Sequence, residues 1–269
     1  MNIAVPDFGG SALSGGAEFL DAVPIIEISD EVRDSHRLIG FESHDERARA
    51  FNLLRSQLLK EMADKPVKLI GLTSATPSAG KSFVSLNLAA ALSKITDRKV
   101  VICDFDLRRG SILEAFELET ERDLSEYLRG ELPDWRSALF RVAGSDLYVL
   151  PCRKRMRRSA ELLTSQRFEE LIAGLRALPP EILVVCDLPP VFASDDAMLT
   201  ASHLDGYMLV VEYGRNTEKQ VTEAMAMLSP TPALGTVLNR YRGGFFDAYG
   251  YGYGDPYGIK NYGMSVQPK

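Results

Sequence analysis

Residues able to bind phosphate gather in one short stretch of the sequence, at Gly80, Lys81 and Ser82. The ammonium group of Lys81 can reach the β- and γ-phosphates of a nucleoside triphosphate, and the hydroxyl of Ser82 can ligate magnesium. Backbone amides and the positive end of a helix dipole suit the same anion. The expected triphosphate-binding loop comprises Ala75, Thr76, Pro77, Ser78, Ala79, Gly80, Lys81, Ser82 and Phe83.

Acidic residues follow two apolar runs farther along the chain. Asp104 and Asp106 come after residues 99–103, and Asp187 comes after residues 182–186. The C-terminal ends of parallel strands are where an open α/β sheet places its ligand chemistry. These acids therefore point to magnesium or to a proton acceptor, and in loop NTPases an aspartate at the place of Asp187 holds the magnesium. An alternative interpretation is that Asp104 caps the helix that follows it.

The elements that must position these side chains alternate between strand and helix. Continuous apolar runs typical of buried strands precede the loop and both acidic motifs, and helical spacing of apolar residues follows the loop. The alternation predicts an α/β fold, a P-loop NTPase-like three-layer sandwich whose mainly parallel sheet is covered by helices on both faces. The expected strands lie within residues 67–72, 99–103, 147–150, 182–186, 206–211 and 235–238.

Three segments of the chain differ in composition. Residues 1–44, with glycine pairs and scattered acids, are expected to form an extended or partly disordered N-terminal segment. Residues 45–240 carry the motifs and form the expected P-loop domain, and residues 241–269 form an expected flexible tail rich in tyrosine and glycine. The P-loop domain opens on an amphipathic helix, which is either an ordinary surface helix or a subunit contact. Its apolar stripe comprises Phe51, Leu54, Leu58 and Met62.

Composition excludes several classes of protein. The chain has 269 residues, a net charge of -6 and a pI near 5.3, which argues against a nucleic-acid partner held by bulk electrostatics. No run approaches the roughly 20 apolar residues of a membrane span, and the N-terminus lacks a signal peptide, so we expect a cytoplasmic protein. Cys103, Cys152 and Cys186 are odd in number and widely spaced, which favours reduced thiols in the core.

Tyrosine is concentrated at the end of the chain, since six of the ten tyrosines lie between residues 241 and 262. The glycines between them forbid a stable helix and favour a mobile, extended tail. One interpretation is a low-complexity adhesive tail. The other is a row of phosphate acceptors flexible enough to enter an active site. The candidate acceptors are Tyr249, Tyr251, Tyr253, Tyr257 and Tyr262.

Several motifs occur together between residues 45 and 262. They are Thr73-Ser74 with Pro77 and Gly80-Lys81-Ser82, Asp104-Phe-Asp106-Leu-Arg-Arg109, Asp187-Leu-Pro-Pro190, Asp196-Ala197, Asp205-Gly206, Val237-Leu-Asn-Arg240 and the tyrosine cluster. The combination resembles the bacterial tyrosine kinases of capsule and exopolysaccharide systems. It looks closest to members that are separate cytoplasmic chains, including the exosortase-associated autokinases with Gly-Tyr tails.

The resemblance implies that residues 45–240 form a kinase domain. The activity would be an ATP- and magnesium-dependent autokinase that phosphorylates its own C-terminal tyrosines and regulates exopolysaccharide or capsule polymerisation and export. Lys81 would hold the β- and γ-phosphates and stabilise charge during transfer. Ser82, Asp104 and Asp187 would hold magnesium. Asp104 or Asp106 would orient or deprotonate the incoming tyrosine hydroxyl.

The same resemblance implies several partners. A membrane polysaccharide chain-length regulator, supplied as a separate chain, would hold the protein at the inner face of the plasma membrane. A phosphotyrosine phosphatase and further copies of the chain are also expected, and nucleic acid is not. Asn239, in the last motif, is added to the expected nucleotide-binding residues.

The chain departs from the family at three places. One is residues 152–158, where the family tends to have a Gly/Pro-rich segment and where this chain could carry a different partner surface. Where the family usually has Gly-Glu this chain has Ser78-Ala79, and a positive φ at Ser78 would cost about 1 kcal/mol or more. The ring-forming helix of the family carries Glu-x-x-Arg-x-x-Arg, whereas the aligned residues here are Arg49, Asn52 and Arg55. We therefore do not expect the octameric ring of the family to carry over.

Two other functions stay open at this point. An ATPase of the septum- and chromosome-positioning type shares the loop and acidic motifs, but it has a second lysine five residues before Lys81, where this chain has Thr76. The other is a nucleotide-binding scaffold whose kinase activity is weak or absent, supported by the altered loop and helix. ATP binding without tail phosphorylation would favour the scaffold.

Overall fold

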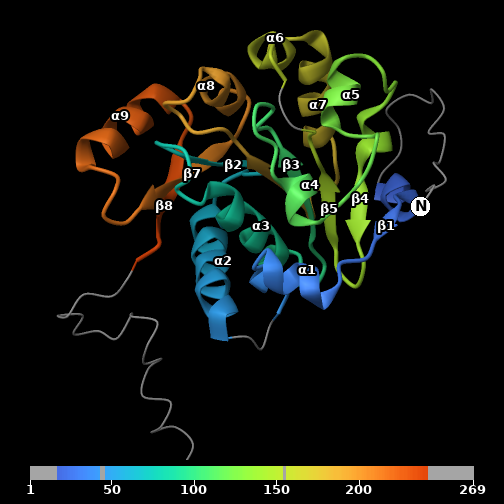
Figure 1. Ribbon diagram of the computed structural model, residues 1–269, viewed down its shortest axis with the longest axis horizontal. Helices are drawn as coiled ribbons and strands as arrows, with labels where there is room; N and C mark the ends of the chain where they lie inside the picture. Colours follow the sequence, from blue (N-terminus) through green and yellow to red (C-terminus); the bar gives the residue numbers. More distant parts are fainter. Residues whose placement is uncertain (1–16, 43–45, 154–155, 242–269) are drawn as a thin grey trace, which may run out of the picture.

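The computed structural model describes residues 17–42, 46–153 and 156–241. A single eight-stranded sheet runs through this part of the chain in the order β1-β4-β5-β3-β6-β2-β7-β8, and helices cover both of its faces (Figure 1). The three-layer α/β sandwich predicted from the sequence is confirmed. The strands are β1 (Ile25–Ile26), β2 (Leu69–Ser74), β3 (Lys99–Asp104), β4 (Phe140–Val142), β5 (Leu147–Leu150), β6 (Ile182–Asp187), β7 (Gly206–Glu212) and β8 (Ala233–Asn239).

The sheet is parallel in all its neighbouring pairs except β4 and β5. Strands β2 and β6 are buried along their whole length, and β3 is buried beyond its first residue. This is the burial that continuous apolar strands have when helices lie on both faces. Alternate residues of one strand serve opposite faces, since Leu69 packs into one apolar core and Ile70 into the other.

The helices divide between these two cores. Residues of α2, α3 and α4 pack in the core on one face, and residues of α5 to α9 pack in the core on the other. The α-helices are α1 (Asp30–Ser35), α2 (Arg49–Met62), α3 (Lys81–Leu92), α4 (Ile112–Ala115), α5 (Leu124–Leu128), α6 (Ser159–Leu163), α7 (Gln166–Arg176), α8 (Asp196–Ala201) and α9 (Glu218–Leu228). Four 3₁₀ helices are described, η1 (Ala17–Ala22), η2 (Ile39–Phe41), η3 (Glu46–Ala48) and η4 (Trp135–Ala138).

The N-terminal segment differs from the prediction wherever the structure describes it. Residues 17–42 were expected to be extended or partly disordered, but they form η1, β1, α1 and η2. Strand β1 pairs in parallel with β4 at the edge of the sheet. The physical reason is burial of widely spaced apolar side chains, because Leu20 and Val23 enter one core and Leu38 and Ile39 enter the other.

The order of the strands brings the sequence motifs together. Strand β6 lies between β2, which leads into the phosphate-binding loop, and β3, which ends at Asp104. Asp104 is in register with Asp187, and Asp187 is in register with Leu72 near the end of β2. Both acidic motifs and the loop therefore lie together at the C-terminal ends of these central strands.

The predicted helix from residue 45 is confirmed as η3 and α2, and Phe51, Leu58 and Met62 of its stripe are buried. The three cysteines are buried and free, as expected for core thiols. None of the helices within the described residues is both long and apolar enough to span a membrane.

Candidate active site

The phosphate-binding loop turns twice through left-handed backbone before α3 begins. Gly80 has a φ of 91°, and a Cβ there would lie 2.1 Å from Asn239 Nδ2, so both backbone and space favour glycine. Ser78 has a φ of 65°, so the serine that stands where the family usually has glycine does adopt a positive φ. Helix α3 then opens at Lys81, and its first turn leaves backbone N–H groups at the loop.

Lys81 lies at the centre of a buried polar network. Its Nζ is 3.0 Å from Asp106 Oδ2 and 3.1 Å from Asp187 Oδ2. Ser82 Oγ donates a hydrogen bond of 2.6 Å to the same Asp187 oxygen. Residues from the loop, from the end of β6 and from just beyond β3 therefore meet at one ammonium group.

The charge of Lys81 is stabilised by these neighbours. Burial acts to lower the pKa of its ammonium, but attraction to Asp187 and Asp106, with a smaller contribution from Asp104, outweighs that effect. The net result is a pKa above the ordinary value for lysine. These neighbours therefore favour the charged form of Lys81, although its side chain is only 10% exposed.

Asp187 is fixed through both of its carboxylate oxygens. Ser82 and Lys81 bind Oδ2, and Ser85 Oγ donates to Oδ1 at 2.9 Å. Ser85 was not identified from the sequence. The available signal was its spacing, because a residue four positions after Lys81 lies on the same face of α3.

Asp104 is fully buried, as Asp187 is, and its carboxylate binds backbone amides. Its side chain accepts hydrogen bonds from the amides of Asp106, Ser111 and Ile112 at 3.2, 2.9 and 3.1 Å. Burial raises the pKa of the Asp104 carboxyl to about 8, and the nearby charge of Asp187 adds to the rise. The capping alternative is supported, since Asp104 holds the amides at the start of α4, whereas its metal and catalytic roles stay predictions.

A cavity of about 710 Å³ opens beside Lys81 and Ser82. Ser111 and Ser194 are among the residues that line it, and their buried hydroxyls have no hydrogen-bond partner in the part of the chain that the structure describes. Unpaired buried hydroxyls are costly unless a ligand or water satisfies them. Together with a lysine and the start of α3, they fit a polyanionic ligand such as a nucleoside triphosphate.

The oxygen atoms around Asp187 also fit magnesium. Ser82 Oγ and Asp187 Oδ2 lie 2.6 Å apart and are hard oxygen donors. No group of three or more acidic, histidine or cysteine side chains within the described ranges is arranged to hold a metal by itself. Magnesium commonly takes only one or two protein ligands and completes its shell with water and substrate phosphates, so this donor pair is sufficient.

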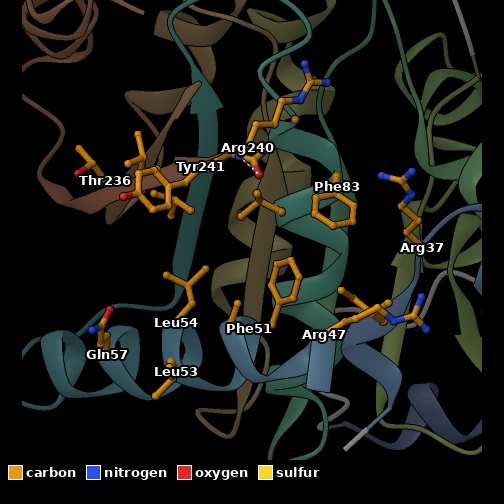
Figure 2. A pocket seen from close by; sticks show the side chains of 17 residues that line it. Arg37, Arg47, Phe51, Leu53, Leu54, Gln57, Phe83, Thr236, Arg240 and Tyr241 are labelled. Atoms are coloured by element: carbon orange, nitrogen blue, oxygen red, sulfur yellow. Dashed lines mark hydrogen bonds between the residues drawn. The ribbon is translucent and has the colours of Figure 1, made fainter. Parts of the chain in front are cut away.

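A second, larger groove of about 1000 Å³ reaches Gly80 from the side of α2 and β8. Figure 2 shows Phe51 of α2 and Phe83 of α3 facing each other in this groove, and their ring centroids are 5.5 Å apart. Asn239 at the end of β8 donates to the Ala79 carbonyl at 2.8 Å, which ties β8 to the loop. The expected nucleotide-binding residues Phe83 and Asn239 thus both line this groove.

Three further hydrogen bonds of the site were not predicted from the sequence. Arg108 Nε donates to Asp196 Oδ2 at 2.8 Å and to Ser159 Oγ at 2.9 Å, which joins the acidic motif after β3 to α8 and α6. Asn216 donates to Thr76 Oγ1 at 2.9 Å. Thr76, which replaces the second lysine of the positioning ATPases, therefore forms a bond that lysine could not accept.

The structure brings together four of the predicted catalytic and metal-binding residues, Lys81, Ser82, Asp106 and Asp187. The predicted tyrosine acceptors lie outside the described residues, which end at Tyr241.

Comparison with known proteins agrees with this geometry. No protein-family profile matches the chain. Tyrosine-protein kinase Etk of Escherichia coli is 32% identical over 198 residues, which is 72% of this chain and 27% of Etk. The solved kinase domain of Etk matches with a TM-score of 0.70 and 29% identity, covering 86% of this chain and 94% of that domain. The chain belongs to the bacterial tyrosine kinase family.

The chain spans only part of one relative's length and most of another's. The match covers about a quarter (27%) of the length of Etk. Tyrosine-protein kinase YwqD of Bacillus subtilis is 29% identical, and that match covers 78% of this chain and 86% of YwqD. The septum site-determining protein MinD of Pyrococcus horikoshii, solved with Mg-ADP, has a TM-score of 0.54 and 20% identity over 65% of this chain and 70% of its own. That likeness shows the shared P-loop NTPase fold alone.

Proposed function

We propose that this chain is an ATP- and magnesium-dependent protein-tyrosine kinase that phosphorylates tyrosines of its own C-terminal tail. The observation that carries the proposal is Lys81, held between Asp106 and Asp187 beside a cavity with unpaired hydroxyls. Phosphoryl transfer requires mainly positioning and neutralisation of charge, and this arrangement supplies both. The names of Etk and YwqD as tyrosine-protein kinases support the same chemistry.

The two cavities suggest how a nucleotide lies. The phosphates of ATP would lie over loop residues 75–82, and the base would lie toward the groove that Phe83 and Asn239 line. Lys81 binds the β- and γ-phosphates, and Ser82 with Asp187 holds magnesium. When bound, the metal neutralises phosphate charge, and MinD, which shares the fold, was solved with Mg-ADP.

Two acids of the motif after β3 have different roles in this proposal. Asp106 contacts Lys81 directly, and we assign to it the orientation of the tyrosine hydroxyl and the receipt of its proton. Asp104, bonded to three backbone amides, holds the turn that carries Asp106. In the transfer the phenolic oxygen bonds to the γ-phosphorus, the bond from that phosphorus to the β,γ-bridging oxygen breaks, and ADP leaves.

The wider biological role rests on the family resemblance. We propose that the protein regulates exopolysaccharide or capsule polymerisation and export with a membrane chain-length regulator. That partner would hold it at the inner face of the plasma membrane, and a phosphotyrosine phosphatase would reverse the modification. Co-purification of the chain with a membrane regulator, compared before and after incubation with ATP, tests this part separately.

The test of the kinase proposal is mass spectrometry of the full chain after phosphatase treatment and incubation with ATP and magnesium. The wild type should gain phosphate on tail tyrosines, the Lys81→Met variant should gain none, and Asp106→Asn and Asp187→Asn should each lose most of it. Normal tail phosphate in Lys81→Met contradicts the assignment of this loop. Demonstrable ATP binding by a wild type that stays unmodified favours the nucleotide-binding scaffold instead.

A further inference from the structure

Three arginines line the cavity beside Lys81, and two of them are bound to buried acids. Arg108 lies 2.8 Å from Asp196, and Arg240 lies 2.8 Å from Glu212. Asp196 and Glu212 are 0% and 5% exposed, so each pair is anchored in the fold. These two guanidinium groups are largely committed to structure.

Arg109 is different from the other two. Its backbone amide donates to the Asp106 carbonyl and to Asp106 Oδ1, both at 3.0 Å, so its place next to the acid that contacts Lys81 is fixed. Its side chain is exposed and lines the cavity. In the stretches of chain that the structure describes, no acidic group forms an ion pair with its guanidinium. A cation without a compensating acid among the described residues is therefore part of the cavity lining.

The rest of the cavity wall suits an aromatic residue with polar neighbours. Pro189, Pro190 and Ala193 offer apolar surface, and the hydroxyls of Ser111 and Ser194 are buried and lack a partner among the described residues. A tyrosine ring can lie against prolines while its hydroxyl meets polar groups. With a tyrosine bound in this way, the guanidinium of Arg109 could pair with an acidic residue that flanks the tyrosine in the acceptor segment.

The tail supplies such acids at only some of its tyrosines. Asp247 precedes Tyr249 by two residues, and Asp255 precedes Tyr257 by two residues. In an extended segment, side chains two residues apart project to the same side with their Cα atoms about 7 Å apart. The other candidate acceptors have no acid at that position, as Tyr249 precedes Tyr251, Tyr251 precedes Tyr253 and Lys260 precedes Tyr262.

The tail also begins beside this cavity. Arg240 lines it, and the described chain ends at the following residue, Tyr241. Eight further residues lead to Tyr249, which an extended chain covers in at most about 28 Å. The tether therefore permits entry into this cavity or into that of another copy.

We propose that Arg109 determines acceptor specificity by pairing with an acid two residues before the tyrosine, so that Tyr249 and Tyr257 are the preferred acceptors. This inference rests on the proposed kinase function and goes beyond it, because it ranks the tyrosines. Without Arg109 such an acid would approach the carboxylates around Lys81 and the triphosphate, which repel it. In this proposal Tyr251, Tyr253 and Tyr262 gain nothing from Arg109, because none of them has an acid two residues before it.

The experiment measures phosphate occupancy at each tail tyrosine in the full, phosphatase-treated chain after incubation with ATP and magnesium. In Arg109→Glu, occupancy at Tyr249 and Tyr257 relative to Tyr251 and Tyr253 should fall at least about threefold, an effect of the size of a reversed exposed ion pair. Arg98→Glu is the matched control. Arg98 precedes β3 at the opposite end of that strand, so this variant should keep the wild-type distribution.

Charge exchange supplies the decisive comparison. Asp247→Lys with Asp255→Lys should restore the preference for Tyr249 and Tyr257 in the Arg109→Glu chain and reverse it in the wild type. An unchanged distribution in Arg109→Glu overturns the proposal. An equal loss at every tyrosine also overturns it, since Arg109 would then act on the nucleotide. A wild type without any tail phosphate refutes the kinase function itself, and that outcome is distinct from both.

Discussion

Ser78 in the phosphate-binding loop has a strained backbone conformation but an exposed side chain, so substitutions there change backbone strain more than packing. Ser78 holds a φ of 65°, a conformation that costs an L-residue about 1–2 kcal/mol and that a β-branched residue tolerates least. Its side chain is exposed, so substitution there changes little packing. The loop thus stores strain where the family usually has glycine.

We predict that Ser78→Gly keeps or raises the free energy of unfolding, because relief of strain offsets the extra freedom of glycine in the unfolded chain. Ser78→Val should lower it by about 1 kcal/mol or more. Urea unfolding of the protein without nucleotide measures both. If the glycine and valine variants unfold at the same urea concentration, the left-handed turn is not under strain.

At the residue scale, Asp104 and Asp106 show what the sequence predicted of the site and what it did not. The apolar run at residues 99–103 was enough to place Asp104 and Asp106 at the end of a strand, and β3 extends to Asp104 itself. It could not tell which acid faces Lys81. That depends on the turn after β3, in which Asp104 binds backbone amides and Asp106 approaches Lys81 at 3.0 Å.

At the scale of elements, α3 connects the phosphate-binding loop to the N-terminal segment. Asn87 of α3 accepts a hydrogen bond from the Gly40 amide at 2.7 Å and donates to the Arg37 carbonyl at 3.1 Å. The packing is close, since a Cβ at Gly40 would lie 2.2 Å from the backbone carbonyl oxygen of Asn87. One buried side chain therefore fastens residues 37–40 to the helix that begins at Lys81.

We predict that Asn87→Ala lowers the free energy of unfolding by about 2 kcal/mol, because it leaves the buried Gly40 amide without its acceptor. Asn52→Ala on the neighbouring α2 is the control, and it should change stability by less than about 0.5 kcal/mol. Urea unfolding gives the free energies. Hydrogen exchange should also speed up at residues 37–42 in Asn87→Ala, and equal effects of the two variants would contradict this account.

For helix α2, the sequence predicted the buried face but not the polar contacts of the helix. Its apolar stripe predicted the buried face, with Phe51, Leu58 and Met62 in the core. The pattern did not reveal that Arg55, the one residue matching the family's ring-forming motif, donates to the Ala91 carbonyl at 3.0 Å. Its guanidinium is thus partly engaged within its own chain.

At the scale of the whole molecule, the site joins elements that are distant in sequence. The loop after β2, the ends of β3, β6 and β8 and the first turns of α3 all contribute to it. A ligand bound there stabilises the folded state by mass action, by about 2.7 kcal/mol at one hundred times its dissociation constant. Binding should therefore be measurable as stability of the entire domain.

We predict that ADP with magnesium raises the melting temperature more than ADP with a chelator does, because in the proposed site Ser82 and Asp187, whose oxygens lie 2.6 Å apart, would hold the metal against the phosphates. Asp187→Asn should remove this difference, and Asp146→Asn, which changes a carboxylate paired with Arg141 instead, should keep it. Thermal unfolding of the three proteins at matched ADP tests the prediction. A full magnesium effect in Asp187→Asn would show that the metal is held elsewhere.

The sequence by itself determined the fold class and the residues of the loop and acidic motifs. Continuous apolar runs ending in acids define parallel strands, and the glycine, lysine and serine of the loop have few other uses together. These are local properties, since each depends on residues adjacent in the chain. The apolar stripe of α2 belongs to the same class.

Only the tertiary structure decided which distant residues meet. The order β3-β6-β2 places Asp187 between the loop and Asp106, and the contacts of Ser85, Arg108 and Asn87 follow from packing that no local pattern encodes. The N-terminal segment shows the same limit. Its apolar residues are sparse along the chain, and they become structured at residues 17–42 because a core formed by the rest of the chain buries them.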